Sequence, residues 1–354
     1  FLIAEHQFGF RSQHSTIQQC HRIVRVISNT FEAKQFCSAV FLDVSQAFDK
    51  VWHKGLLLKI RSQLPCGYYN ILESYLANRK FKVRVNTKTS ISHQIEAGVP
   101  QGSVLAPFLY ILFTSDFPTL QSTTTATFAD DIAILSTHAD ASKATLILQR
   151  HLNVIEEWTK KWRIKINESK SSHITFTLNK TTCPGVLFYG QAIPSTECVK
   201  YLGMHLDRRL TWKDHIRAKL KTIKIRTAEL YWLLGRKSIL SIDNKLLIYK
   251  AIIKPIWTYG IELWSCASKS NIALMQRAQS KILRQITDAP WFVSNKTLHD
   301  DLHIDFINKI IQINSIKHFQ KLQHHSNNIV TQLLETSTSR RLKKKLPEDN
   351  MEEP

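Results

Sequence analysis

The sequence predicts an α+β fold, in which strands and helices are followed by a mainly helical region. Two observations predict the strands. A compact apolar run at 39–42 is typical of a buried strand, and two β-prone runs meet within 123–136 as a hairpin. A third observation predicts the helical region, because apolar residues recur at helical spacing from Trp212 to about Arg284.

The charge of the chain predicts a polyanionic partner. Lys and Arg number 48 against 28 acidic residues, which gives the 354 residues a net charge of +20. Because this excess is spread along the whole chain, the simplest partner is a nucleic acid. A membrane surface is the other candidate, but no apolar run approaches the length that a bilayer requires, and no amphipathic segment gathers the basic residues.

The first predicted strand ends in a carboxylate. A helix expected over 15–27 precedes the strand at 39–42, and Asp43 follows that strand directly. A helix is then expected at once, over 45–60. A strand that delivers Asp43 just before a helix suits a metal ligand on a rigid element. The alternative is that Asp43 only caps that helix.

A loop rich in Gly and Pro follows further along the chain. A helix is expected over 68–76 and an alternating basic strand over 81–85. The loop GVPQGS, 98–103, comes next, and Ser103 can cap a helix over 104–113. Such a loop lets backbone N–H groups and a side-chain amide approach a ligand closely. The alternative is a simple turn with an N-cap.

The hairpin predicted within 123–136 lacks the residues that hairpin turns usually prefer. Asp130 and Asp131 stand between the two runs, where a relaxed hairpin would prefer Asn-Gly or Asp-Gly. Adjacent carboxylates among apolar neighbours repel each other and resist desolvation. A hard cation such as Mg²⁺ would relieve both costs, because it binds oxygen ligands. A surface hairpin with two hydrated aspartates is the alternative, since short motifs have many false positives.

The rest of the chain is predicted to become progressively helical and basic. An amphipathic helix is expected over 146–162, and strands are expected over 173–176 and 199–204. Basic residues then crowd the first helix after Trp212, which is either a surface that follows phosphates or a solvated helix face. They are Lys213, Arg217, Lys219, Lys221, Lys224 and Arg226. Weaker helices and a basic tail, 340–345, are expected beyond Pro290.

Taken in order, these segments resemble a reverse transcriptase. The resemblance covers roughly residues 5–290, and its ordered motifs are specific as a set. The residues that carry it are Phe41–Asp43, Phe48–Asp49, Gly98–Ser103, Phe128–Asp131, Lys170 and Tyr201–Gly203. More narrowly, the phrases HQFGFR (6–11), PQGSVLAP and FADD are similar to those of non-LTR (LINE-like, jockey-type) retrotransposons.

The resemblance implies a right-hand polymerase with fingers, a palm of antiparallel sheet and helices, and a helical thumb. Fingers and palm would occupy 1–207 and lack their upstream part, because the chain begins within a motif. The thumb would occupy 208–290, and a helical extension with the basic tail would occupy 291–354. Endonuclease, RNase H and cysteine–histidine segments are not expected in this chain.

The resemblance also implies the roles of individual residues in a nucleotidyltransferase. Asp43, Asp130 and Asp131, with the Val44 carbonyl, would bind two Mg²⁺ ions, for which Mn²⁺ can substitute, and Lys170 would act on pyrophosphate. The nucleotide would contact residues of three separate segments, and the template–primer would contact a loop and the thumb. The nucleotide-binding residues would be Arg11, Phe48, Gln101 and Gly102, and the primer- or template-binding residues Tyr201, Leu202, Gly203, Lys219, Lys221 and Lys224.

The implied activity is RNA-directed DNA synthesis for a transposable element. Its partners would be an RNA template, a DNA primer or nicked target DNA, and deoxynucleoside triphosphates, with no membrane. The implied location is intracellular, in the nucleus after a cytoplasmic ribonucleoprotein stage. One alternative is a decayed or repurposed remnant that binds RNA without catalysis. Decay usually damages the catalytic acids, but Asp43, Asp130 and Asp131 are all present in this chain. A weaker alternative is a relative of intron maturases or telomerase.

Overall fold

The computed structural model describes residues 3–335 and 340–350 and divides the chain into two compact units. The first unit is Phe1–Glu197 and the second is Cys198–Pro354. Among the described helices, none combines the length and the apolar character that crossing a membrane requires.

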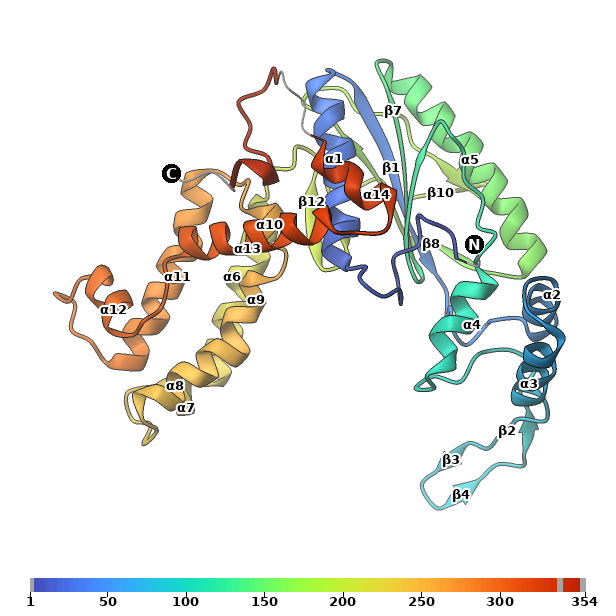
Figure 1. Cartoon of the computed structure of the whole chain (residues 1–354), viewed down its shortest axis with the longest axis horizontal. Helices are drawn as coiled ribbons and strands as arrows, with labels where there is room; N and C mark the ends of the chain where they lie inside the picture. Colours follow the sequence, from blue (N-terminus) through green and yellow to red (C-terminus); the bar gives the residue numbers. More distant parts are fainter. Residues whose placement is uncertain (1–2, 336–339, 351–354) are drawn as a thin grey trace. The chain divides into compact units, whose positions relative to one another are not determined.

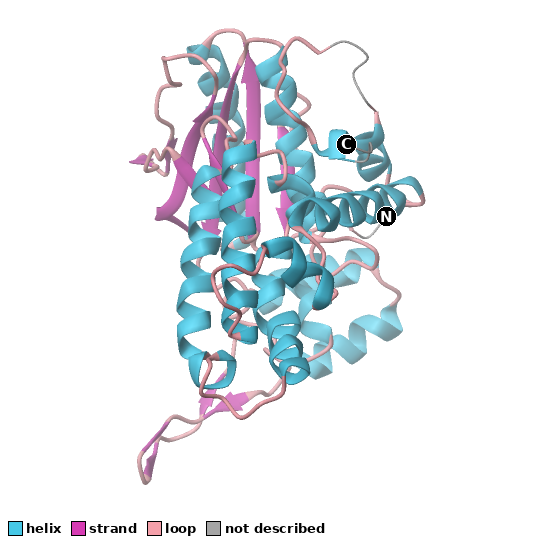
Figure 2. Ribbon diagram, turned by 90° about the vertical axis from the view of Figure 1, so that its left-hand side faces the viewer, coloured by secondary structure: helices cyan, strands magenta, loops and turns pink. Residues whose placement is uncertain are grey.

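A four-stranded antiparallel sheet forms the centre of the first unit (Figures 1 and 2). Residues 36–42, in the third strand of this sheet, are all buried, because other strands flank that strand on both sides and helices pack on it. In sheet order the strands are β6 (Thr124–Phe128), β7 (Asp131–His138), β1 (Phe36–Val44) and β8 (Ile166–Phe176). The strand expected at 39–42 and the hairpin expected within 123–136 are confirmed.

Helices pack on this sheet and extend beyond it. The first helix begins with a capping box, in which Ser15 and Gln18 bond to each other's backbone N–H groups. The first helix of this unit, α1 (Thr16–Glu32), packs on β6 and β1. The last helix of this unit, α5 (Ala141–Trp162), packs on β7 and β1. The helices of this unit are α1 (Thr16–Glu32), α2 (His53–Gln63), α3 (Cys66–Leu76), α4 (Leu105–Phe113) and α5 (Ala141–Trp162).

The remaining strands of the first unit form small two-stranded pairs. The basic strand expected over 81–85 is wrong as one element, because the chain there forms two short strands with separate partners. The pairs are β2 (Lys80–Phe81) with β5 (His93–Gln94), β3 (Arg84–Val85) with β4 (Lys88–Thr89), and β9 (Leu187–Phe188) with β10 (Gln191–Ala192).

The segment directly after β1 also differs from the expectation. The helix expected over 45–60 begins only at His53, and residues 45–50 form turns instead. Gln46 has a φ of 52°, in the left-handed region, which a right-handed helix does not accommodate. The N-cap of α2 is Trp52, so the alternative that Asp43 caps this helix is wrong. Phe48, expected inside the helix, lies in the turns.

The second unit begins with a hairpin and is otherwise helical, as expected from Trp212 onward. The hairpin pairs β11 (Cys198–Tyr201) with β12 (Met204–Asp207). The helices are α6 (Lys213–Glu229), α7 (Tyr231–Leu234), α8 (Ile242–Ile248), η1 (Tyr249–Ile253, a π-helical turn), α9 (Lys254–Thr258), α10 (Ile261–Trp264), α11 (Lys269–Thr287), α12 (Asn295–Asp301), α13 (Ile307–Gln323), α14 (Asn328–Thr331) and the 3₁₀ turns η2 (Gln332–Leu334) and η3 (Pro347–Asn350).

Two features of the second unit bear on the expected domain limits. The expected boundary after residue 207 places the β11–β12 hairpin with the sheet, whereas the compact units place it with the helices. The basic tail packs against its own unit. Arg340 pairs with Asp349 at 2.8 Å, and Lys344 Nζ donates to the Arg209 carbonyl at 2.7 Å.

Candidate active site

Three carboxylates meet at one end of the central sheet. Asp43, near the end of β1, is the register partner of Asp131, the first residue of β7. Asp131 also pairs with Phe128 of β6, so Ala129 and Asp130 form the two-residue turn between these strands. The side chains of Asp43 and Asp131 are exposed, and that of Asp130 is half-buried. The fold therefore brings together the three acids that the sequence singled out.

The charges of this cluster act on one another. Protein atoms around the Asp131 carboxyl withdraw part of its water, and the charges of Asp130 and Asp43 add repulsion, so the pKa of Asp131 rises to about 6. Burial, followed by the charges of Asp130 and Asp131, also raises the pKa of the Tyr110 hydroxyl. The cluster thus creates a negative field that a cation would neutralise.

The donor chemistry of this cluster fits Mg²⁺. Carboxylate and carbonyl oxygens are the ligands this ion prefers, and Asp43, Asp130 and Asp131 supply the carboxylates. Within the ranges that the structure describes, no group of three or more Asp, Glu, His or Cys side chains is arranged so that it could hold a metal ion by itself. Polymerase-type sites do not require one, because Mg²⁺ there binds one or two carboxylates together with substrate phosphates and water. Val44, the proposed carbonyl donor, pairs with Ile166 of β8.

A bulge in β8 places Lys170 beside Asp43. The register of β1 with β8 jumps from Phe41–Ser172 to Asp43–Asn167, which leaves residues 168–171 out of the ladder. Ser171 Oγ accepts from the Asp43 N–H at 3.1 Å and so ties the bulge to β1. Lys170 and Asp43 line one open, polar pocket with about 570 Å³ of space. Its other lining residues are Val44, Ser45, Gln46, Lys50, Lys165, Asn167 and Glu168.

Phe48 lies in the turns after β1 and packs among aromatic rings. Its ring stacks on Tyr110 at a centroid distance of 4.7 Å and meets Phe10 edge-on at 6.1 Å. The side chain is half-buried against the hydrophobic core. Tyr110 and Ala129, the residue before Asp130, line the same pocket, so this stack lies near the turn that carries Asp130.

The loop with Gln101 and Gly102 is joined to the same turns. The N–H groups of Gly98 and Val99 donate to the carbonyls of Val51 and Phe48 at 2.8 and 2.9 Å. Gly98 has a φ of 94°, and a Cβ there would lie 2.7 Å from the Asp49 carbonyl oxygen, so a larger residue would push the two segments apart. Gln101 Nε2 donates to Asp49 Oδ1 at 2.7 Å, and both Gln101 and Gly102 are exposed.

Arg11 bonds to its own segment. Its Nη1 donates to the carbonyls of Ala4 and Gln7 at 3.1 and 3.0 Å. Partial burial lowers the pKa of this guanidinium, and Glu5 opposes that shift. Arg11 follows Phe10, which touches Phe48, so its segment reaches the turns beside the site.

The residues expected to bind primer and template lie in the second unit. Tyr201 is buried, and Leu202 and Gly203 form the turn of the β11–β12 hairpin. The Tyr259 hydroxyl donates to the Leu202 carbonyl at 2.7 Å and so holds this turn. On α6, Lys219 is half-buried with Nζ 5.2 Å from the centre of the Tyr259 ring. Lys221 and Lys224 are exposed on the same helix.

The sequence did not single out several residues that the structure places near the carboxylates. Lys50 and Lys165 line the pocket with Asp43, and Tyr110 stacks on Phe48. Gln7 bonds to the turn that carries Asp130. Gln7 lies inside the HQFGFR phrase, in which only Arg11 was assigned a role; the other three residues carry no local signal, because their proximity arises from the fold.

Comparisons with known proteins show the family of the chain. A family model described as reverse transcriptase (RNA-dependent DNA polymerase) matches residues 2–206. The chain is similar to probable RNA-directed DNA polymerases from two transposons of Drosophila melanogaster: it is 41% identical to that of the X-element, over 98% of this chain, and 39% identical to that of BS, over 97%. It is also 38% identical, over 98% of its length, to the RNA-directed DNA polymerase from mobile element jockey of Drosophila funebris.

The coverage of these relatives is partial. The chain spans 39–40% of the length of each of the three. Among solved structures, apo telomerase from Candida tropicalis is a distant neighbour, with a TM-score of 0.42, 11% identity, and coverage of 94% of this chain and 58% of that one. The family match and the curated relatives confirm the resemblance and, with it, the α+β right-hand polymerase fold. The chain belongs to the reverse transcriptase family, among the enzymes of non-LTR retrotransposons.

Proposed function

We propose that this chain extends a DNA 3′ end on an RNA template by two-metal nucleotidyl transfer. The observation that carries the proposal is the meeting of Asp43 with Asp131 across adjacent strands, with Asp130 in the adjoining turn. Membership of a family whose enzymes use divalent metals supports it. The net charge of +20 supports a nucleic-acid substrate.

The residues around the carboxylates are suited to nucleotide addition, which is an in-line displacement at phosphorus. Asp43, Asp130 and Asp131, with the Val44 carbonyl, hold the cations. When bound, two Mg²⁺ ions, or Mn²⁺ in their place, stabilise the charge on the attacking and leaving oxygens.

Other residues of the first unit bind the nucleotide in this proposal. Lys170 lines the same pocket as Asp43, and in this proposal it neutralises or protonates the pyrophosphate there. Arg11 contacts the triphosphate, and Gln101 and Gly102 contact the nucleotide and the template. Phe48 packs against the sugar of the incoming nucleotide and excludes a 2′-hydroxyl.

The second unit binds template and primer in this proposal. The turn Tyr201–Gly203 holds the primer end, and Lys219, Lys221 and Lys224 contact phosphates of the duplex. The primer is a DNA end or nicked target DNA. A nuclear site of action, after a cytoplasmic ribonucleoprotein stage, stays a prediction from the family.

The experiment that tests the proposal is extension of a labelled DNA primer on an RNA template, with Mg²⁺ and all four deoxynucleotides. We expect templated, full-length products that require the divalent ion. Tight RNA binding without extension, with Mg²⁺ or Mn²⁺, would instead support the alternative of a remnant that binds RNA without catalysis. A matched reaction without template controls for untemplated addition.

A further inference from the structure

The turn that carries Asp130 adopts a conformation that its own residues do not favour. Only Ala129 and Asp130 connect β6 to β7, and Ala129 has a φ of 56°. An L-residue with a Cβ is uncommon in this left-handed region, which is why hairpin turns of this kind favour Gly, Asn or Asp. Something outside the turn must therefore hold Ala129 in place.

The side chain of Gln7 supplies that hold. Its Oε1 accepts from the Ala129 N–H at 2.9 Å, and its Nε2 donates to the Ala129 carbonyl over a longer distance of 3.5 Å. Gln7 is 5% exposed and Ala129 is 7% exposed, so little water is available to replace these bonds. One amide thus engages both backbone groups of the strained residue.

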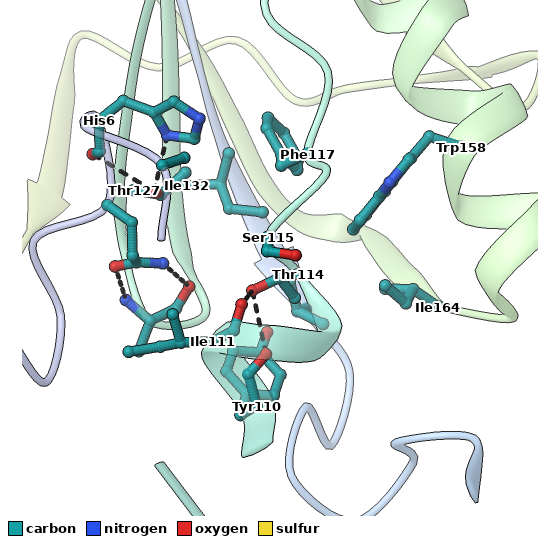
Figure 3. Close-up of a pocket in the computed structure, with 14 residues that line it drawn as sticks. His6, Tyr110, Ile111, Thr114, Ser115, Phe117, Thr127, Ile132, Trp158 and Ile164 are labelled. Atoms are coloured by element: carbon teal, nitrogen blue, oxygen red, sulfur yellow. Dashed lines mark hydrogen bonds between the residues drawn. The ribbon is translucent and has the colours of Figure 1, made fainter. Parts of the chain in front are cut away.

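The chain around Gln7 fixes the position of this amide. Gln7 forms a parallel bridge to Thr127 of β6, and the Phe8 N–H donates to the Thr127 carbonyl at 2.9 Å. The His6 ring lies against Thr127, with 3.1 Å between its Nδ1 and the Thr127 hydroxyl (Figure 3). Gln7 Oε1 also accepts from the Gly9 N–H at 2.8 Å.

Gly9 allows the close approach that the clamp requires. A Cβ on Gly9 would lie 2.3 Å from the Ala129 nitrogen, a distance that real atoms do not reach. The N-terminal segment is therefore fitted to the turn at backbone level, and this fit fixes the position of Gln7 beside Ala129.

We infer that Gln7 is a positioning residue, which holds Ala129 in its left-handed conformation and thereby aims the Asp130 carboxylate toward Asp43 and Asp131. The inference rests on the proposed function, in which Asp130 binds metal. Without the clamp, both buried backbone groups of Ala129 lose a partner and the turn relaxes away from positive φ. The carboxylates then no longer converge, and the affinity for divalent cations falls.

The competing explanation is that Gln7 merely anchors the N-terminal segment. Gln19 provides a matched control, because its Nε2 donates to the carbonyls of His6 and Thr127 at 3.0 and 2.7 Å without bonding Ala129. Gln7→Met and Gln19→Met each remove one buried amide from the same junction at similar volume. A purely structural role would lower the melting temperature in both variants and would leave the metal response of each unchanged.

The test measures the increase in melting temperature on titration with Mg²⁺, together with kcat and the Mg²⁺ concentration for half-maximal primer extension. We expect Gln7→Met to require at least about five-fold more Mg²⁺ in both assays and to lower kcat about ten-fold, with template–primer Kd unchanged. Gln19→Met keeps the parental Mg²⁺ midpoint. In Gln7→Met, the added change Ala129→Gly restores part of the response, because Gly adopts positive φ without strain.

The inference is overturned if folded Gln7→Met has the parental kcat and needs the same Mg²⁺ concentration as the parent for the half-maximal response in both assays. It is also overturned if Gln19→Met shifts that Mg²⁺ concentration as much as Gln7→Met does. If Gln7→Met does not fold, amide hydrogen exchange on the parent decides: the Ala129 N–H must be protected, and exchange at the rate of a free amide overturns the clamp. The melting assay needs no activity, so it tests the clamp even if the chain fails to extend primers, whereas that failure counts against the proposed function alone.

Discussion

Asp43 and Asp131 occupy facing positions on β1 and β7, so their side chains project from the same face of the sheet. Like charges at facing positions destabilise a sheet. Partial withdrawal of water by the surrounding protein atoms, together with the charges of Asp130 and Asp43, raises the pKa of Asp131 to about 6. The fold therefore holds at this end a repulsion that a divalent cation removes. This repulsion lowers the stability of the folded chain, which is explained if the role of the three carboxylates is to bind a cation.

Replacing Asp130 by Asn tests the metal assignment at nearly constant size. We expect primer extension to fall by at least about 100-fold, because several kcal/mol of charge stabilisation is lost, while binding of the template–primer duplex is retained. Asp301→Asn makes the same chemical change at an exposed position of α12 and should leave extension unaltered. Near-parental extension by Asp130→Asn would show that Asp130 is not catalytic.

Replacing Phe48 by Val distinguishes a sugar gate from a core side chain. As a gate, Phe48 excludes the 2′-hydroxyl sterically, so the variant should accept ribonucleotides more readily while deoxynucleotide use falls only modestly. The measurement is the ratio of kcat/KM for deoxynucleotide over ribonucleotide. We expect this ratio to fall by at least about ten-fold, or roughly 1.4 kcal/mol of discrimination.

Phe108→Val is the matched control for the gate, because Phe108 packs on the same hydrophobic core as Phe48. As a core residue, Phe48 would behave like Phe108, with lower stability, lower activity toward both sugars and an unchanged ratio. An unaltered ratio in folded Phe48→Val would therefore reject the gate.

Local pattern was sufficient to predict the strands of the site. Strands of the central sheet form at the apolar run 39–42 and at the β-prone runs within 123–136. At these positions the tertiary contacts favour the same structure as the local sequence pattern. The unusual residues between the two runs were visible in the sequence as well, although the turn itself is Ala129–Asp130 and Asp131 already begins β7. What held that turn was not visible, because Gln7 reaches Ala129 only through the fold.

The turns after β1 could not be predicted for a related reason. Gln46 is an ordinary helix former by composition, yet it has a φ of 52°. The distant loop at Gly98 and Val99 pairs with the carbonyls of Val51 and Phe48 and so holds the chain out of a helix there. Tertiary hydrogen bonds overrode local propensity at this point. Their pattern depends on residues that lie far away in the sequence.

Neutralising three lysines of α6 tests whether this helix follows phosphates. With Lys219, Lys221 and Lys224 changed to Gln, duplex binding should weaken about equally for all sequences. The slope of log K against log salt should become shallower by roughly 0.9 for each of these lysines that binds a phosphate in the parent. Lys317→Gln, at an exposed position of α13, should leave the slope unaltered.

The structure separates these lysines into two kinds. Lys221 and Lys224 are exposed, whereas burial and then the charge of Lys200 lower the pKa of half-buried Lys219, which lies over the Tyr259 ring. We therefore expect the Lys221/Lys224 double variant to change the salt slope without loss of stability. An unchanged slope in the triple variant would mean that this face of α6 is only solvated.

Lys59 of α2 lies among aromatic rings, with its ammonium 3.7 Å from the centre of the Trp162 ring and its side chain 5% exposed. Burial lowers the pKa of Lys59 to about 8, although the bond to Asp116 opposes that shift. The folded chain therefore loses this proton at lower pH than the unfolded chain, whose Lys59 keeps its ordinary value of 10.5. Between these two values the unfolded state binds more protons, so stability should rise with pH.

The measurement is the free energy of unfolding in urea from pH 7.5 to 10.5, for the parent and for Lys59→Met. Lys59 should contribute a gain on the order of 2 kcal/mol across this window, present in the parent and absent from Lys59→Met. Subtracting the two curves removes the titration of other lysines and thiols. Lys54→Met, at an exposed position of α2, should keep the parental rise. A flat difference between parent and Lys59→Met would show that the buried ammonium carries no such penalty, and that its aromatic contacts and Asp116 offset the lost water in full.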